Sequence, residues 1–279
     1  MKAVDAANAC IPVLDHGFLF GDSIYEVVRT VNGKLFAWEE HLRRLRNSAK
    51  RLAYKLPWSE MELTLEIEDA VEQAPWDGDT YLRIIITRGV GRIELAPDTC
   101  ESPSLIVIAK KLPQVPDEFY EKGIVLCLTE VRRNSRLAMD PGIKSGNYLN
   151  NVLAMIESRR KGADDAVMLN EHGFLTESTT SNLFIVKDGM LKTPSLDCGI
   201  LAGITRGYLL DVVKGKGIPV EEAELVVDDL RSADEVFITG TIKAVVPVRK
   251  VIGEVEWEGK PGEVTSRIRD AYFEATGLG

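Results

Sequence analysis

The chain has 279 residues, of which 45% are hydrophobic and 28% charged, and its formal net charge at pH 7 is −9. This length suits one large or two smaller globular domains, and the acidic balance argues against a protein that binds nucleic acid through phosphate contacts. The four cysteines show no paired spacing, and we see no apolar run long enough to span a bilayer. We therefore expect a reduced, cytoplasmic protein with no membrane partner, and its three histidines are too few for a His-rich metal site.

The first part of the chain combines strand and helix patterns. Asn32-Gly33 is typical of a hairpin turn, and Ser59 with Glu62 has the spacing of a capping box at a helix start. A glycine-containing loop, 89–97, is long enough to reach a neighbouring protein. In chain order, these patterns predict a strand ending near residue 31, helices at 38–54 and 60–73, and strands at 81–88 and 104–109.

The remaining chain predicts a larger α+β domain. We expect a small N-terminal domain at 1–113, a proline-containing linker at 114–123 and a larger C-terminal domain at 124–279. The mixture of hairpins and helices favours an α+β fold over a regularly alternating one. The predicted elements of the second domain are strands at 124–130, 165–169, 182–193, 235–239 and 245–251 and helices at 147–161, 205–215 and 261–275.

Lys144 is the strongest candidate for a catalytic residue. It lies in a short loop that Pro141 and Gly142 separate from the preceding chain, just before the helix predicted at 147–161. A lysine held on a defined turn can lose its proton and attack a carbonyl carbon to form a Schiff base. An isolated lysine of this kind is more often an ordinary surface residue, so the prediction depends on the motifs around it.

Other segments suggest a partner for such a lysine. Glu177 follows a hairpin, where its carboxylate could keep a ring nitrogen protonated, as a pyridoxal ring requires. The turn that leads into the helix near Thr205 could bind phosphate through backbone N–H groups. Arg44 on the 38–54 helix could hold phosphate through two hydrogen bonds, and the Thr239–Thr241 turn is of a kind that binds anions.

These motifs resemble the fold type IV pyridoxal-phosphate enzymes, which include branched-chain aminotransferases, D-amino-acid aminotransferases and aminodeoxychorismate lyases. The resemblance covers nearly the whole sequence. It implies a two-domain α+β fold with a smaller N-terminal α/β domain and a larger C-terminal domain that has a barrel-like sheet. The matching segments are residues 15–22, 39–45, 87–91, 144–151, 177–184, 203–206 and 245–248.

The resemblance also assigns roles to residues. It implies that Lys144 forms the Schiff base with pyridoxal 5′-phosphate, that Tyr148 bonds the ring hydroxyl oxygen, and that Glu177 bonds the pyridine nitrogen. The residues implied to bind phosphate are Arg44, Ile204, Thr205 and Thr241. The residues implied to lie beside the substrate are Tyr25, Arg29, Tyr81, Arg83 and Ile242, and Arg92 and Lys243 are further candidates.

The substrate is open to more than one interpretation. Tyr81 and Arg83 match residues that branched-chain enzymes place by the substrate, whereas Val27 stands where those enzymes have glycine. The segment around Tyr25 is closer to D-amino-acid enzymes. Our first hypothesis is a transaminase that exchanges an amino group between a branched-chain L-amino acid and 2-oxoglutarate, working as a homodimer or higher homo-oligomer. The alternatives are a D-amino-acid or (R)-amine transaminase, an aminodeoxychorismate lyase and a non-enzymatic cofactor-binding protein.

Overall fold

The computed structural model describes residues 3–278, and the chain divides into two compact units. Unit 1 contains the chain up to Pro113 together with the short segment Ile143–Asn147. Unit 2 contains Gln114–Gly142 and the chain from Tyr148 onward. The segment that carries Lys144 therefore belongs to unit 1, although the chain on both sides of it belongs to unit 2.

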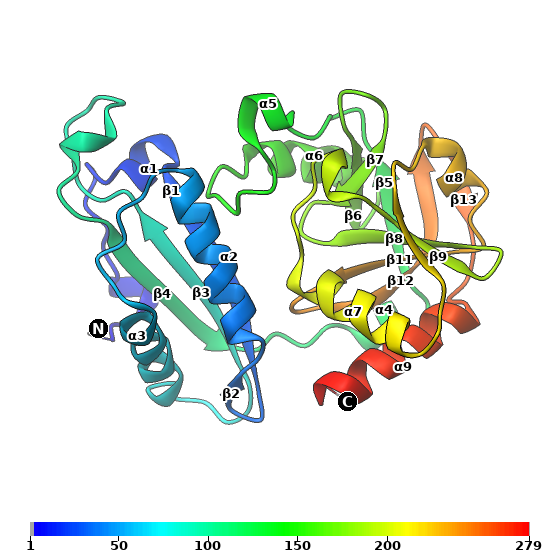
Figure 1. Ribbon diagram of the computed structural model, residues 1–279, viewed down its shortest axis with the longest axis horizontal. Coiled ribbons are helices and arrows are strands. Elements are labelled where there is room, and N and C mark those ends of the chain that lie inside the picture. The colour runs from blue at the N-terminus through cyan, green and yellow to red at the C-terminus, as the bar shows by residue number, and fades with distance from the viewer. Residues whose placement is uncertain (1–2, 279) are drawn as a thin grey trace. The chain divides into compact units, whose positions relative to one another are not determined.

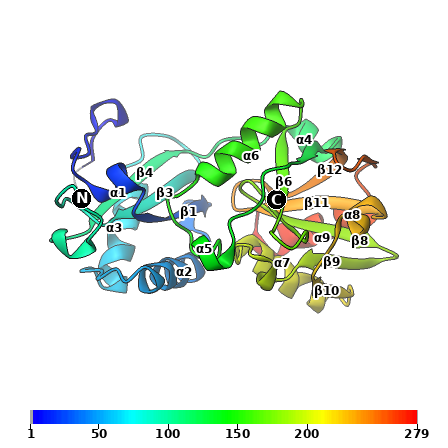
Figure 2. The ribbon, with the colours of Figure 1, turned by 90° about the horizontal axis from the view of Figure 1, so that it is seen from above.

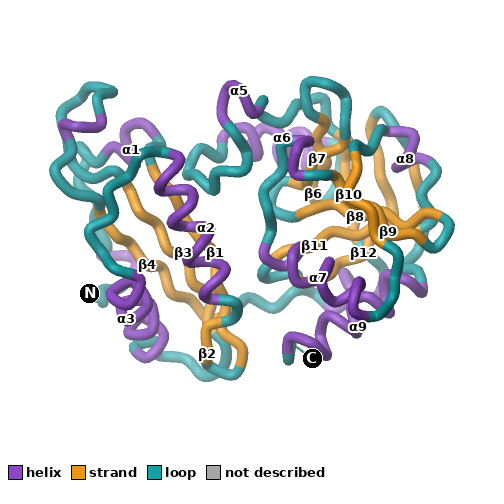
Figure 3. Tube along the Cα trace, viewed as in Figure 1, coloured by secondary structure: helices purple, strands orange, loops and turns teal. Residues whose placement is uncertain are grey.

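Unit 1, as far as the structure describes it, is a four-stranded sheet with helices α2 and α3 on one face (Figures 1 and 3). The strands lie in the order β2-β1-β3-β4, and both pairings of β3 are antiparallel. The elements are α1 (His16–Phe20), β1 (Ser23–Val31), β2 (Lys34–Leu35), α2 (Trp38–Arg51), α3 (Glu60–Glu72), β3 (Thr80–Thr87) and β4 (Ser104–Lys111). The 3-10 turns Ala6–Asn8 and Pro97–Thr99 complete the unit.

The two faces of this sheet differ because side chains alternate along each strand. On one face, Ile24, Val28 and Leu82 are fully buried under Leu45 of α2 and Leu63 of α3. The opposite face carries the odd-numbered residues of β1 and β3, most of which are only half-buried. One face of the sheet thus forms the core of unit 1, and the other presents polar and aromatic side chains that can take part in function.

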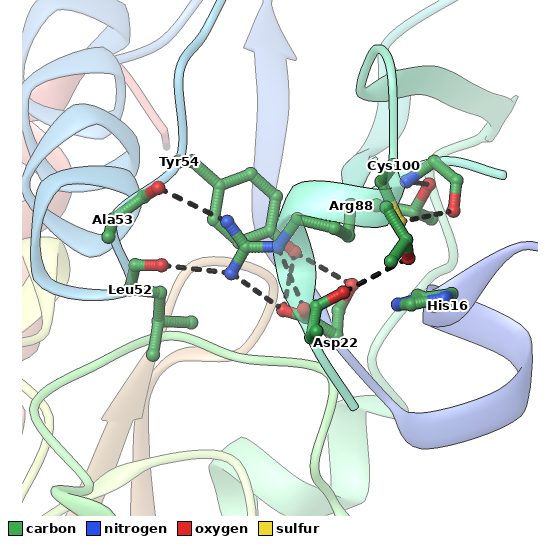
Figure 4. Close-up of polar contacts among 12 residues, drawn as sticks. His16, Asp22, Leu52, Ala53, Tyr54, Arg88 and Cys100 are labelled. Carbon is green, nitrogen blue, oxygen red and sulfur yellow. Dashed lines mark hydrogen bonds and ion pairs between the residues drawn. The ribbon is translucent and has the colours of Figure 1, made fainter. Parts of the chain in front are cut away.

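A polar cluster joins the start of β1 to the ends of α2 and β3 (Figure 4). Arg88 donates through Nε to Asp22 Oδ2 at 2.8 Å and through Nη2 to the carbonyl of Leu52 at 2.8 Å. Its guanidinium carbon lies 3.7 Å from the centre of the Tyr54 ring, and the Tyr54 hydroxyl donates to the Asp22 carbonyl at 2.7 Å. Arg88 thus supplies donors for the carbonyl groups of Leu52 and Ala53, which lie just past the end of α2, where carbonyl groups have no partner within a helix.

Unit 2 contains, within the described chain, a closed sheet of six strands. The closed order is β8-β11-β12-β5-β6-β7, and β7 pairs back with β8 through Glu177 and Asn182. Strands β9 and β10 extend from β8, and β13 pairs with β12. The strands are β5 (Ile124–Leu128), β6 (Asp165–Leu169), β7 (Leu175–Ser178), β8 (Asn182–Lys187), β9 (Met190–Pro194), β10 (Val220–Ala223), β11 (Glu235–Gly240), β12 (Ala244–Gly253) and β13 (Trp257–Glu258).

Helices pack against this barrel from outside. A buried cluster joins Leu209 of α7 and Ile268 of α9 to Phe184 and Phe237, whose rings stack with centres 4.9 Å apart. Helix α6 lies along β6 (Figure 2). The helices are α4 (Asp117–Glu121), α5 (Arg136–Met139), α6 (Leu149–Arg160), α7 (Ile204–Gly215), α8 (Val227–Arg231) and α9 (Glu263–Thr276), with a 3-10 turn at Leu196–Cys198.

The α+β prediction with a barrel-like sheet in the larger part is confirmed. The helix expected at 147–161 begins at Leu149, and the helix expected at 38–54 ends at Arg51. Chain 114–123, which was expected to be a linker, contains the short helix α4 and belongs to unit 2. No helix within residues 3–278 has the length and apolar character needed to cross a membrane.

Candidate active site

The segment around Lys144 is fixed by the edge of β1. The amide of Tyr25 donates to the Lys144 carbonyl at 3.0 Å, and the amide of Gly146 donates to the Ser23 carbonyl at 2.8 Å. The amide of Lys144 donates to Ser48 Oγ on α2 at 3.2 Å. Backbone bonds on both sides of the lysine therefore set its position in unit 1, as expected for an amine that must be presented at a defined point.

The residues that follow the lysine fit this close approach. A Cβ atom at Gly146 would collide with Ser23 Oγ, so glycine lets the two backbones pair without moving the Ser23 side chain. Asn147 Nδ2 donates to the carbonyl of Gly21 at 2.9 Å, and Gly21 itself has a φ of +68°. The sequence Lys144-Ser145-Gly146-Asn147 thus encodes a short extended segment that joins β1.

The ring of Tyr25 lies next to two cationic groups. Lys144 Nζ is 4.6 Å from the ring centre, and the guanidinium carbon of Arg83 is 4.1 Å from it. The Tyr25 side chain is buried. A reactive amine and a guanidinium that can bind a carboxylate therefore border one aromatic ring, which is an arrangement suited to an amino acid or a 2-oxo acid.

The other substrate candidates of unit 1 lie on the same face of the sheet as Tyr25. Arg29 is directly opposite Tyr81 in the β1–β3 register, and Val27 is opposite Arg83. Directly opposite residues share one face, and all four of these side chains are half-buried on the face that α2 and α3 leave uncovered. Arg92 differs from them, because its side chain is 78% exposed and pairs with Glu94 at 2.8 Å.

Arg44, which was expected to bind phosphate, belongs to a buried ionic cluster on the other face. Its Nε and Nη2 donate to the two carboxylate oxygens of Glu26, both at 2.7 Å. His41 Nδ1 donates to the same carboxylate at 2.7 Å. Burial raises the pKa of Glu26, but the charge and hydrogen bonds of Arg44 and the bond from His41 outweigh it and bring the pKa to about 2. Burial lowers the pKa of His41 and outweighs the opposing effect of Glu26.

Within the described residues, Glu177 of unit 2 accepts hydrogen bonds from at least four N–H groups. Arg133 donates to Oε1 through Nε at 3.1 Å and through Nη2 at 2.9 Å. Oε2 accepts from Asn182 Nδ2 at 3.3 Å and from the amide of Leu201 at 3.1 Å. The carboxylate lies at the point where β7 closes the barrel on β8, so both its backbone and its side chain are fixed. An anionic group held in this way could stabilise a proton on a ring nitrogen.

The start of α7 offers donors for a phosphate. Among the described residues no side chain caps the first turn, which begins at Ile204 and includes the buried Thr205. A side chain at Gly203 would collide with Asn182, so this turn lies against β8. Asn182 is also the residue whose Nδ2 donates to Glu177. Phosphate sites typically combine uncapped N–H groups at a helix start with a glycine that leaves room for the phosphate.

Two buried hydroxyl groups near this turn support that interpretation. Ser181 Oγ and Thr239 Oγ1 have no hydrogen-bond partner within the described residues. Thr239 pairs with Asn182 across β11 and β8. A Cβ atom added at Gly240 would lie 3.2 Å from Ser181 Oγ. Buried hydroxyls normally have partners, so acceptor oxygens of a bound group would fit here. The residues present therefore fit a cofactor that carries a phosphate.

The remaining candidates of unit 2 lie in two turns. Thr241 and Ile242 form part of the turn between β11 and β12 and are half-buried. Lys243 ends that turn, and its Nζ donates to Oδ2 of the buried Asp165 at 3.2 Å. Tyr148 is the half-buried N-cap residue of α6. The Lys243 ammonium group is thus engaged by a carboxylate within unit 2.

Sequence reasoning did not find Arg133 or the ionic role of Glu26. Arg133 lies in the loop after β5, and an arginine beyond a strand end is a weak signal without a known acceptor. Glu26 was visible as a charged residue inside an apolar strand, which is the usual sign of a buried ion pair. Within residues 3–278 no group of His, Cys, Asp and Glu side chains could hold a metal ion.

Comparison with known proteins identifies the family. The model of "Amino-transferase class IV" matches residues 23–251. The chain belongs to this family, which confirms the resemblance seen in the motifs and makes the protein an aminotransferase. Enzymes of this family use pyridoxal phosphate.

Individual relatives carry two kinds of name. A Methanocaldococcus jannaschii protein provisionally named a branched-chain-amino-acid aminotransferase is 39% identical over 273 residues, covering 97% of this chain and 93% of its own. The D-alanine aminotransferase of a Listeria monocytogenes strain is 37% identical and covers 97% and 92% of the two chains. The sequence is thus similar both to an enzyme named for branched-chain amino acids and to one named for D-alanine.

Solved structures are similar over nearly the entire chain. The branched-chain amino acid aminotransferase of Escherichia coli superposes with a TM-score of 0.92 at 32% identity, covering 99% of this chain and 92% of the other. Another branched-chain amino acid aminotransferase, solved with pyridoxamine 5′-phosphate, has a TM-score of 0.88 at 32% identity and covers 98% and 92% of the two chains.

Proposed function

We propose that this aminotransferase uses pyridoxal 5′-phosphate to move the amino group of a branched-chain L-amino acid to 2-oxoglutarate. The observation that carries the proposal is the pair of cationic groups at Tyr25, with Lys144 Nζ at 4.6 Å and Arg83 at 4.1 Å from its ring centre. An amine that can move the proton at Cα, next to a guanidinium that can bind a carboxylate, suits the groups that every 2-amino acid presents. Arg29 on the same sheet face adds a second guanidinium, which suits a dicarboxylate acceptor.

The residues would divide the work as follows. When bound, pyridoxal phosphate supplies an electron sink for the negative charge that forms at the substrate's Cα. Lys144 holds the cofactor covalently in the resting enzyme, and its freed amine then moves the proton at Cα. Glu177 stabilises a positive charge on the ring nitrogen, and Tyr148 binds the ring hydroxyl oxygen.

Candidate groups for binding phosphate occur in each unit. In unit 2, Ile204 and Thr205 offer the N–H groups of the α7 start, and Thr241 lies in the turn after β11. In unit 1, Arg44 offers a guanidinium whose direction is set by its two bonds to Glu26. The substrate candidates are Tyr25, Arg29, Tyr81, Arg83 and Ile242.

A half-reaction screen tests the proposal. The purified protein is loaded with pyridoxal 5′-phosphate and mixed with L-leucine, L-valine, D-alanine or an aromatic (R)-amine, and the loss of the cofactor absorption band is followed. We expect L-leucine to remove the band and 2-oxoglutarate to restore it with formation of L-glutamate. Lys144→Ala should lose at least about a thousandfold in turnover, whereas Lys122→Ala, at the exposed end of α4, should not change it.

Other outcomes would replace the proposal with a different one. A response to D-alanine alone would assign a D-amino-acid transaminase, which the similarity to the Listeria monocytogenes enzyme favours as the second candidate. Pyruvate released from aminodeoxychorismate without any amino acceptor would assign a lyase. A loaded protein that reacts with no amine or amino acid would contradict transaminase activity altogether.

We further infer a cytoplasmic homodimer. All four cysteines are free thiols, which suits a reducing compartment. In unit 1, large apolar side chains are exposed on the N-terminal segment and on the 89–97 loop, namely Val13, Phe18, Ile93 and Leu95. Such exposure marks an interaction surface. Sedimentation equilibrium should give twice the chain mass, and a monomer at micromolar concentration would contradict this inference.

A further inference from the structure

Arg133 makes more contacts around Glu177 than a simple ion pair requires. It donates twice to Oε1 of Glu177, and its Nη1 donates to the Oδ1 atoms of Asn150 and Asn151, both at 3.2 Å. The side chains of Arg133 and Glu177 are only 9% and 7% exposed. All three guanidinium nitrogens are therefore engaged in a nearly dry environment.

The main chain of Arg133 and the asparagines that receive its hydrogen bonds are themselves fixed. The Arg133 amide donates to the Leu169 carbonyl of β6 at 2.8 Å. Asn150 Nδ2 donates to the Arg132 carbonyl at 2.8 Å, and Asn151 Nδ2 donates to the Thr179 carbonyl at 2.7 Å. The main chain of Arg133 is thus anchored to β6, and its guanidinium bonds two asparagines at the start of α6 that are held in turn by the Arg132 and Thr179 carbonyls. A planar group held at these points can fix a carboxylate in one orientation.

We propose that Arg133 is a positioning residue for the cofactor, which acts through Glu177. This inference depends on the proposed function, because it assumes that Glu177 faces the ring nitrogen. Arg133 supplies the positive charge that makes a buried carboxylate tolerable and holds Oε1, while Asn182 and the Leu201 amide hold Oε2. Without Arg133 the carboxylate would turn away or take up a proton, and in either case it would no longer stabilise a charged ring nitrogen.

The planar shape of the guanidinium, with three nitrogens that donate in different directions, should matter for the orientation of Glu177 as well as its charge. Lysine has one nitrogen and cannot bond Glu177 and both asparagines in the same geometry. Arg133→Lys should therefore keep the charge next to Glu177 but lose part of its orientation. Arg133→Gln removes the charge and most of the donors. The two variants separate the electrostatic effect from the geometric one.

The first measurement is cofactor binding to the cofactor-free protein. Titration with pyridoxal 5′-phosphate should give a dissociation constant about tenfold higher or more for Arg133→Gln than for the unchanged protein. Arg136→Gln is the matched control, since Arg136 lies in the same region and pairs with Asp197 at 2.7 Å on a half-exposed side chain. The control should bind the cofactor as the unchanged protein does.

The second measurement is the pH midpoint of the bound cofactor's absorption band. A charged ring nitrogen withdraws electrons and lowers the proton affinity of the nitrogen that links Lys144 to the cofactor. Loss of that charge in Arg133→Gln should move the midpoint to higher pH, by about one unit, and Arg133→Lys should recover part of the shift. The same shift is expected for Glu177→Gln. The double variant should show no further shift, because Arg133 acts only through Glu177.

The possible outcomes distinguish a failure of this inference from a failure of the proposed function. If the unchanged protein forms no absorption band with pyridoxal 5′-phosphate, the proposed function fails and this inference fails with it. If the unchanged protein binds the cofactor but Arg133→Gln keeps its affinity and pH midpoint, only the inference is overturned. A lower melting temperature in Arg133→Gln with both cofactor measurements unchanged would assign Arg133 a purely structural role.

Discussion

The two units each contain a buried pair of arginine and glutamate, but the member that we propose to contact the cofactor differs between them. In unit 1, Glu26 is fully buried and orients Arg44, so the arginine is the member that we propose to bind phosphate. In unit 2, Arg133 orients Glu177, so the carboxylate is the member that we propose to face a ring nitrogen. We therefore propose that the same kind of ion pair serves a site through its arginine in unit 1 and through its carboxylate in unit 2.

The largest expected effect comes from breaking the pair in unit 1. Glu26→Gln leaves Arg44 with a neutral partner in a fully buried position, and we expect a loss of about 3 kcal/mol in the free energy of unfolding. Glu177→Gln should cost less, about 1 to 2 kcal/mol, because Arg133 keeps its bonds to Asn150 and Asn151. Urea unfolding of the cofactor-free protein measures both, and equal losses would contradict the comparison.

Low pH should weaken the ion pair of unit 1, because Glu26 takes up a proton. Its pKa of about 2 in the folded protein lies below the ordinary value of 4.5. Because the folded pKa is lowered, the stabilisation is complete above pH 4.5 and is lost as pH falls toward 2, by roughly 3 kcal/mol. His41, whose pKa is also lowered, acts in the same direction as pH falls below 6.5.

Urea unfolding at a series of pH values between about 7 and 2 measures this dependence. Glu26→Gln should flatten the part of the stability curve below pH 4.5, since the titrating group is gone. A curve of the same slope in the variant would assign the acid sensitivity to other carboxylates.

The smallest expected effect is at Lys243. Lys243→Met removes a hydrogen bond to Asp165, but Asp165 also accepts from the Thr179 hydroxyl at 2.6 Å and the Ala166 amide at 2.8 Å. We expect a loss of about 1 kcal/mol in the free energy of unfolding. Asp165→Asn should lower the free energy of unfolding more than Lys243→Met does. The reverse order would mean that the Lys243 bond stabilises the fold more than the other bonds of Asp165.

Much of the fold could be predicted from the sequence because long periodic segments dominate it. The capping box at Ser59 located α3 correctly, and Asn32-Gly33 located the β1–β2 hairpin. The short elements α5, α8, β10 and β13 were not predicted, since two to five residues carry no readable period. The barrel-like sheet was implied by the family resemblance and not by the strand patterns, because the parallel pairing of β5 with β12 joins segments far apart in the chain.

Helix α6 shows a limit of periodicity. Leu149, Val152, Leu153 and Ile156 correctly predicted a helix, yet these side chains are exposed, and Ala154 and Ser158 are buried instead. A pattern of apolar residues identifies the helix but does not say which structure covers its apolar side. The partners of the candidate site residues could not be predicted either, since nothing in the spacing of Arg133 and Glu177 indicates that they meet.

The lysine segment has a consequence for how such enzymes can diversify. Its place beside β1 depends on main-chain bonds at Ser23, Tyr25 and Gly146, to which the side chains of Ser48 and Asn147 add one hydrogen bond each. The loop before it can then lengthen, shorten or change composition while the amine keeps its position. New preferences for one amino acid over another could arise through changes in that loop, without any change in the reactive group.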